Sequence, residues 1–361
     1  MKKVFAILAA GGIMTAATVQ AQVDIYITGS TAFRANAYNS IIALYGANLT
    51  SQNPSPAGSK NMVTFQGTIP GTFGSQTVTI RTSFSGSAAG VQSLTQNNNL
   101  NFLSSASNGD TNLVSHQADL AFSDVFQATT AFLAPTLVDT NVGIQPFAYV
   151  KSSQTPATVT NITIQQLQTF LPNGILTADS FTGNTNDTGT LVYLVGRDSS
   201  SGTRLTAERD SLFIGSELNW QTNGVTCNSW APSPGGSSGG FSSGSGVAGQ
   251  LNSGCGAAIG YLGLADAANV NGGANIIAYN GYKPNVGTVG APDFSPVLNG
   301  LYSFWGYEHL FNRSGAPANV VTFKSVFVNA INNDLGTSIT AIQVGKMKVV
   351  RPSDGGPISP P

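Results

Sequence analysis

Short apolar runs followed by Gly, Ser and Thr recur along the chain and predict the strands of an α/β fold. Three such runs, at 23–27, 77–81 and 191–195, each lead through a small polar turn into apolar residues at helical spacing. Each unit therefore predicts a strand, a tight turn and a helix start. If the three turns converge at one edge of a sheet, their helix starts form a common surface.

The third turn, at 196–204, carries the clearest chemistry. Ser201, Gly202 and Thr203 fall where the helix should begin, and hydroxyl side chains there accept hydrogen bonds from free backbone N–H groups. A helix start also offers unpaired donors and a partial positive charge, which suits an anion. Arg197 adds a forked donor for a tetrahedral oxyanion. The alternative is an ordinary capped helix with a surface arginine.

The other two turns have similar residues. Ser30 or Thr31 would cap the first helix, and Ser87 lies at the start of the second. Asp124 follows a short strand at 118–122, and open α/β sheets bind ligands at such strand ends. The alternative for Asp124 is a turn or cap residue.

An aspartate beside a bound anion is favourable when the anion has a proton to donate. Hydrogen phosphate has one near neutral pH, whereas sulfate has none. An ionised Asp124 would accept that proton from phosphate and repel sulfate, because an unpaired like-charge contact costs several kcal/mol.

The rest of the pattern predicts the connections of this fold. Extended apolar runs at 142–150 and 302–307 are candidate crossovers between two domains. Further expectations are a loop or hairpin at 46–75, a helix at 162–171 stopped by Pro172, a weakly ordered Gly/Ser-rich loop at 231–249, a helix at 320–331 and a final extended strand and turn at 351–357.

The first residues predict export. Two lysines precede an apolar stretch, and a small-residue cleavage site ends at Ala21, so residues 1–21 are typical of a secretory signal peptide. Charged residues make up only 9% of the 361 residues, and the net charge is -1. No basic field is available to attract nucleic acid or an anionic membrane. We expect a periplasmic protein, or alternatively a secreted or cell-surface one.

Cys227 and Cys255 are the two cysteines, and in an exported protein they predict one disulfide; the alternative is two buried thiols. Together with His116 and His309 they show no metal-ligand clustering, so no metal or cofactor is expected. A serine hydrolase is disfavoured because neither histidine has an evident serine partner and residues 196–203 lack a Gly-x-Ser-x-Gly elbow. The chain is therefore not expected to be an enzyme.

These motifs resemble the phosphate-binding proteins of phosphate ABC transporters, in the type II periplasmic-binding-protein superfamily. The matching pieces follow the family's order over nearly the whole mature chain. They are residues 29–33, 86–91, 118–124, the Arg-x-x-x-Ser-Gly-Thr turn from Arg197 to Thr203, and 259–261.

The resemblance implies a role for each matching residue. Donors would come from the first turn (Ser30, Thr31, Ala32, Phe33), from Ser87, and from Ser201, Gly202 and Thr203, with Asp124 as proton acceptor and Arg197 as charged bidentate partner. Ala88 and Ala89 depart from the small polar residues common in the family, so the donor of the second turn stays open. The first turn leaves the choice between Thr31 and Ala32 open.

The resemblance also implies a two-lobed fold with the ligand in the cleft and two hinge crossovers. Lobe I would comprise 22–143 and 305–361, and lobe II 144–304. The expected function is to capture inorganic phosphate and deliver it to a membrane ABC permease, as a monomer. The alternative is a secreted or surface protein that uses the fold for another ligand or for adhesion.

Overall fold

A ten-stranded mixed sheet runs through the protein in the computed structural model, which describes residues 22–57, 60–222, 227, 229–288 and 290–361. The predicted signal peptide lies outside the described residues. The strand order is β10 (Ile175–Thr177), β11 (Leu191–Val195), β14 (Ala258–Gly263), β8 (Asn141–Lys151), β16 (Trp305–Asn312), β7 (Leu120–Ser123), β1 (Gln22–Gly29), β4 (Thr77–Phe84), β3 (Met62–Gly67) and β2 (Leu49–Asn53).

The three predicted strand–turn–helix units are confirmed. β1 leads into α1 (Arg34–Tyr45), β4 into α2 (Ser87–Gln96) and β11 into α5 (Gly202–Asp210). β1 pairs in parallel with both β4 and β7, and β11 pairs in parallel with β14. Parallel pairing puts the turns that follow neighbouring strands at the same edge of the sheet.

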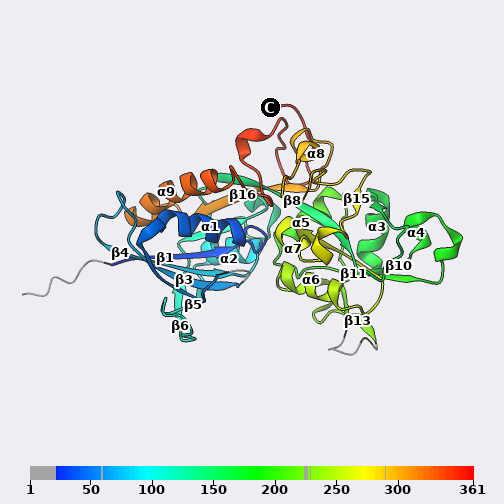
Figure 1. Cartoon of the computed structure of the whole chain (residues 1–361), viewed down its shortest axis with the longest axis horizontal. Coiled ribbons are helices and arrows are strands. Elements are labelled where there is room, and N and C mark those ends of the chain that lie inside the picture. Colours follow the sequence, from blue (N-terminus) through cyan, green and yellow to red (C-terminus); the bar gives the residue numbers. More distant parts are fainter. Residues whose placement is uncertain (1–21, 58–59, 223–226, 228, 289) are drawn as a thin grey trace, which may run out of the picture.

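The extended run predicted at 142–150 is β8, and the one predicted at 302–307 overlaps only the first residues of β16; both are antiparallel strands at the centre of the sheet. β8 and β16 pair with each other, and each also pairs with one flanking half of the sheet. Figure 1 shows α1, α2 and α9 (Ala318–Asp334) on one side of these strands. On the other side lie α3 (Ile164–Asn173), α5, α6 (Gly244–Asn252) and α7 (Leu264–Ala267). The mixed α/β, two-part architecture agrees with the expected fold class, while the lobe boundaries at 143/144 and 304/305 stay predictions.

Each half has its own apolar core. In the first half, Phe33 packs against Phe122 with ring centroids 5.5 Å apart, and Phe327 of α9 meets the same ring at 5.8 Å. In the second half, Tyr149 of β8 stacks on Phe304 at 4.7 Å. Burial of such aromatic side chains supplies much of the stabilisation and fixes the strand ends that carry the turns.

Three local expectations were wrong, each for a physical reason. The 231–249 segment is ordered and includes the start of α6, because its backbone carbonyls accept hydrogen bonds from buried arginines. Pro172 lies inside the last turn of α3, which continues to Asn173 and ends at left-handed Gly174. The 351–357 tail forms bends and turns instead of a strand, since Arg351 anchors it to the carbonyls of Ser303 and Trp305.

Other expectations hold. The 46–75 region contains the β2–β3 hairpin, and the helix predicted at 320–331 lies within α9. The predicted disulfide between Cys227 and Cys255 is present. Within the described residues no helix is long and apolar enough to cross a membrane.

The first turn depends on a glycine. Gly29 has a φ of +111°, and a Cβ atom there would lie 2.0 Å from the Phe122 carbonyl oxygen. Substitution Gly29→Ala should lower the free energy of unfolding by about 3 kcal/mol, because it combines backbone strain with a clash against β7. Chemical denaturation measures this.

Gly109 provides the matched control. Its φ is +90°, but a Cβ atom there meets nothing within 4 Å. Gly109→Ala should therefore cost only about 1 kcal/mol, the strain alone. Equal losses in the two variants would contradict the close approach of β1 and β7.

Candidate functional site

The first two turns meet at the carboxyl ends of β1, β4 and β7. The Ser30 N–H donates to the Phe122 carbonyl at 2.9 Å, and the Gly29 carbonyl accepts from the N–H groups of Ser85 at 3.2 Å and Gly86 at 2.9 Å. These backbone bonds place the first turn beside the second and beside the strand end that precedes Asp124.

Asp124 lies where the two halves of the molecule meet. Its side chain is 1% exposed. The Ser87 hydroxyl at the start of α2 donates to Oδ1, and the Thr203 hydroxyl in the first turn of α5 donates to Oδ2 at 3.3 Å. Both carboxylate oxygens therefore accept from a helix start, one from each half of the sheet.

The ionisation of Asp124 reflects opposing influences. Burial raises the pKa of Asp124 above its ordinary value, while the hydrogen bond from Ser87, the charge of Arg197 and the hydrogen bond from Thr203 act to lower it. Hydrogen bonds to the charged form favour that form. The site therefore compensates the buried carboxylate with hydroxyl donors from two helix starts.

The second and third turns contact each other directly. The Ala88 N–H donates to the Ser200 carbonyl at 3.0 Å, so this backbone donor of the second turn is bonded to the third turn. A Cβ atom on Gly202 would lie 1.6 Å from Asp124 Oδ1 and 2.5 Å from Ser87 Oγ. Residue 202 must therefore be glycine for α2, Asp124 and α5 to approach so closely.

Arg197 is buried next to this contact, at 2% exposure. Nε and Nη2 donate to the carbonyls of Phe241 and Ser242, each at 2.9 Å. Nη1 has no hydrogen-bond acceptor among the described residues. Burial lowers the pKa of Arg197, and the charges of Asp198, Asp124 and Asp266 act to raise it. The guanidinium is fixed by the protein and keeps one terminal nitrogen available.

The predicted residues of the first turn have different surroundings. Thr31 is buried, and its hydroxyl has no hydrogen-bond partner. Ala32 lies against Gly263 at the end of β14, where a Cβ atom would come 2.9 Å from the Ala32 methyl. The Phe33 ring belongs to the apolar core, and its N–H donates to the Ser30 hydroxyl at 3.4 Å. Of this turn, Thr31 has the free polar group.

Ser201 acts as the cap of α5. Its hydroxyl accepts from the Arg204 N–H at 3.4 Å. Just before it, Asp198 accepts from both the N–H and the hydroxyl of Ser200, at 3.1 Å and 2.6 Å. These local bonds hold the turn in shape, and the Ser201 N–H also donates within it, to the Asp198 carbonyl at 3.2 Å.

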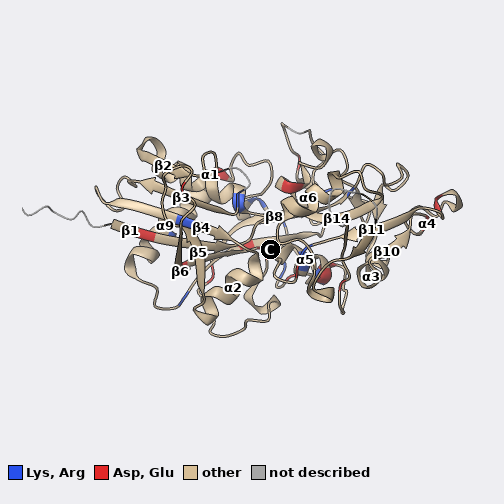
Figure 2. Ribbon diagram, turned by 90° about the horizontal axis from the view of Figure 1, so that it is seen from below, with Lys and Arg blue, Asp and Glu red and all other residues tan. Residues whose placement is uncertain are grey.

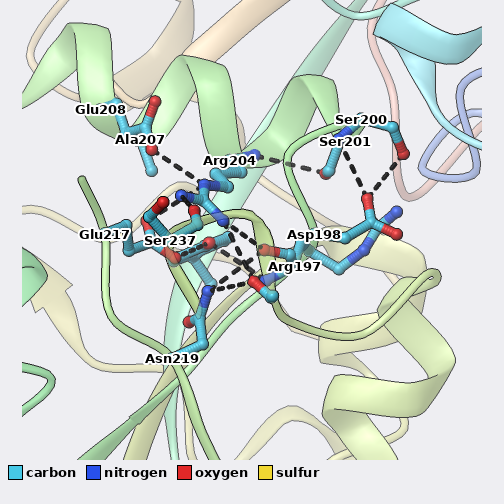
Figure 3. Close-up of polar contacts among 12 residues, drawn as sticks. Arg197, Asp198, Ser200, Ser201, Arg204, Ala207, Glu208, Glu217, Asn219 and Ser237 are labelled. Atoms are coloured by element: carbon cyan, nitrogen blue, oxygen red, sulfur yellow. Dashed lines mark hydrogen bonds and ion pairs between the residues drawn. The ribbon is translucent and has the colours of Figure 1, made fainter. Parts of the chain in front are cut away.

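A buried cluster behind the turn was missed by sequence reasoning (Figure 3). Arg204 Nη1 donates to the carbonyls of Arg197 and Gly239, both at 3.1 Å, and Asn219 Nδ2 donates to the same two carbonyls. Glu217 accepts from the Tyr261 hydroxyl at 2.5 Å. The cluster fixes the backbone of Arg197 on one side and the 231–249 segment on the other.

The histidines have other partners. His309 Nδ1 lies 2.9 Å from Asp139, and His116 stacks on Tyr26 at 3.9 Å. In the described residues neither ring is hydrogen bonded to a serine hydroxyl, and no group of three or more potential metal ligands occurs.

Glu217 makes the free energy of unfolding depend on pH. Burial raises the pKa of Glu217 from 4.5 to about 7, against the charge of Arg204. The folded state therefore favours protonated Glu217, and the resulting stabilisation is complete below pH 4.5 and is lost as the pH rises through about 7.

Glu217→Gln should remove that dependence. As the pH rises from acid to neutral, the wild type should lose about 3 kcal/mol of unfolding free energy that the variant does not lose. Urea denaturation across that range measures the difference, and parallel stability curves for the two proteins would contradict it.

The structure resembles those of substrate-binding proteins. One is a protein from Clostridium perfringens described as a candidate phosphate ABC transporter substrate-binding protein with bound phosphate. It is 17% identical over 89% of this chain and 99% of its own, with a TM-score of 0.54. Another is an ABC-type phosphate transport receptor from Vibrio cholerae, 16% identical over 84% of this chain and 93% of its own, with a TM-score of 0.47.

No family model and no curated protein matches the sequence. The family resemblance seen in the turns is thus supported by structure at the level of the fold. The protein has the two-lobed α/β fold of the Clostridium perfringens substrate-binding protein.

Proposed function

We propose that this protein is an exported solute-binding protein that captures inorganic phosphate and delivers it to a membrane ABC permease. The observation that carries the proposal is the setting of Asp124: a buried carboxylate among hydroxyl donors at two helix starts, with a fixed arginine beside it. This combination suits an anion that brings its own proton.

Several donors around Asp124 are free to bind such an anion. They are the Thr31 hydroxyl, Arg197 Nη1 and the backbone N–H groups at the start of α1, where no side chain caps the helix. Helix starts and guanidinium groups are the usual partners of phosphate oxygens. Asp124 would then accept the proton of hydrogen phosphate.

The comparison and the charge distribution support the same proposal. The Clostridium perfringens protein of this fold is described with bound phosphate. Lys, Arg, Asp and Glu lie at scattered places along the ribbon, with no continuous basic stripe (Figure 2). An anion site here therefore depends on local donors and not on a broad positive surface.

Direct contact between the two halves indicates how a ligand would be enclosed. Ser200 meets Ala88 and Ser85 across the site, and β8 and β16 join the two halves of the sheet. We infer that the lobes open about these strands to admit phosphate and close on it, a hinge motion that a permease can recognise.

Asp124→Asn tests the proton-acceptor role. The amide can donate to sulfate, whereas the carboxylate repels it, so the variant should bind sulfate more tightly and discriminate less between the two anions. We expect the phosphate-to-sulfate affinity ratio to fall by about 100-fold, since an unpaired like-charge contact costs several kcal/mol. Competition calorimetry measures the ratio, and an unchanged ratio would show that Asp124 does not select the ligand.

Arg197→Ala tests the charged contact. Loss of a buried charged partner should weaken phosphate binding by about 100-fold or more, as measured by titration. Arg209→Ala, which removes an exposed arginine at the end of α5, should leave the affinity unchanged. Equal affinities for the wild type and Arg197→Ala would place the ligand elsewhere.

A further inference from the structure

Glu308 is a buried carboxyl group that the proposed cage does not use. It lies on β16, the strand between β7 and β8 at the centre of the sheet. The residue is 0% exposed, and neither Oε1 nor Oε2 has a hydrogen-bond partner. A buried polar group without a partner costs stability, so its presence calls for an explanation.

The register of β16 places Glu308 beside the candidate site. Gly306, two residues earlier on the same face, lies against Asp124: a Cβ atom there would be 2.4 Å from the Asp124 carbonyl oxygen. Gly143 of β8 pairs opposite Glu308, and its Cβ atom would lie 3.2 Å from the Phe33 ring. Glu308 therefore shares a face of the sheet with the Asp124 backbone and with Phe33, which follows Thr31 and its unpartnered hydroxyl in the first turn; Leu335 lies against the same face.

Charge determines the form of Glu308. Burial raises the pKa of Glu308 well above its ordinary value, and the negative charge of Asp124 raises it further. Arg34 on α1 and Asp334 on α9 are charged groups of neighbouring elements. Among the charged groups, Asp124 is the one whose charge raises the pKa of Glu308. This environment favours the protonated carboxylic acid, which has one O–H donor, a form that buried sites can use to bind negative charge.

We propose that Glu308 is a further ligand-binding residue, which donates its O–H to an oxygen of the bound anion while Asp124 accepts the anion's proton. The inference rests on the proposed phosphate site and deepens it. The two carboxyl groups would have opposite roles: Glu308 binds an unprotonated oxygen, and Asp124 requires a protonated one. Together they match hydrogen phosphate, which has both kinds of oxygen.

This arrangement has a consequence at alkaline pH. Once Glu308 loses its proton, it can no longer donate, and it adds a second negative charge near the anion. Phosphate affinity should therefore be full below the pKa of Glu308 in the free protein and fall up to tenfold per pH unit above it.

Two substitutions test the donor role. Glu308→Gln keeps an N–H donor but cannot ionise, so it should bind phosphate within about threefold of the wild type at neutral pH and lose the alkaline decline. Glu308→Leu removes the donor and should bind about tenfold more weakly at neutral pH. Phosphate titration calorimetry from neutral to alkaline pH measures both, and comparison with the wild type cancels the titration of phosphate itself.

A stability measurement separates this role from a structural one. Leucine in place of an unpartnered buried acid should raise the melting temperature even as binding weakens, because the group is retained at a cost to stability. A Glu308→Leu variant that binds as tightly as the wild type, or a Glu308→Gln variant with the same alkaline decline, would overturn the inference and leave the phosphate site standing. A folded wild type that binds no phosphate would overturn both.

Discussion

The carboxylate of Asp124 joins the two helix starts that form the centre of the candidate site. It accepts from Ser87 at the start of α2 and from Thr203 at the start of α5, so one side chain joins the two halves of the sheet. The contact is possible because Gly202 has no Cβ atom to separate them. A buried carboxylate needs such donors, and the helix starts supply them where the strands end.

Backbone carbonyls of the Gly/Ser-rich segment orient Arg197 and help to orient Arg204, which also pairs with the carboxylate of Glu208. Arg197 bonds to Phe241 and Ser242, and Arg204 bonds to Gly239 and Ser237, all in the Gly/Ser-rich segment. Neutral partners orient a guanidinium without cancelling its charge, so the charge of Arg197 remains available to an anion. The scarcity of charged residues in the sequence is consistent with this use of neutral groups.

Local sequence patterns predicted much of the candidate site. The remaining contacts could not be predicted because they depend on tertiary packing between segments far apart in the sequence. The Gly, Ser and Thr turns and Asp124 stand directly after apolar strands, so their place at the sheet edge followed from strand direction alone. Arg204 pairs with Glu217, while Asn219 bonds to the same carbonyls as Arg204 and Tyr261 of β14 bonds to Glu217; the spacing of these residues in the sequence does not predict this cluster. Composition alone predicted weak order for 231–249, since its order depends on donors from α5 and the turn before it.

The surroundings of Glu308 likewise could not be predicted from the local sequence. On sequence alone it is one polar residue in an apolar strand, and its neighbourhood depends on how β16 registers against β7 and β8. Only that register brings it beside Asp124, at the point where the halves join. Residues in the central strands are therefore as relevant to ligand selection as those in the turns.

Titration calorimetry of the anion-free protein, first with phosphate and then with sulfate, tests the central claim most directly. One phosphate should bind per chain, and sulfate should give no measurable heat, because Asp124 requires a proton that sulfate lacks. Equal binding of both anions, or no phosphate binding by a demonstrably folded protein, would contradict it.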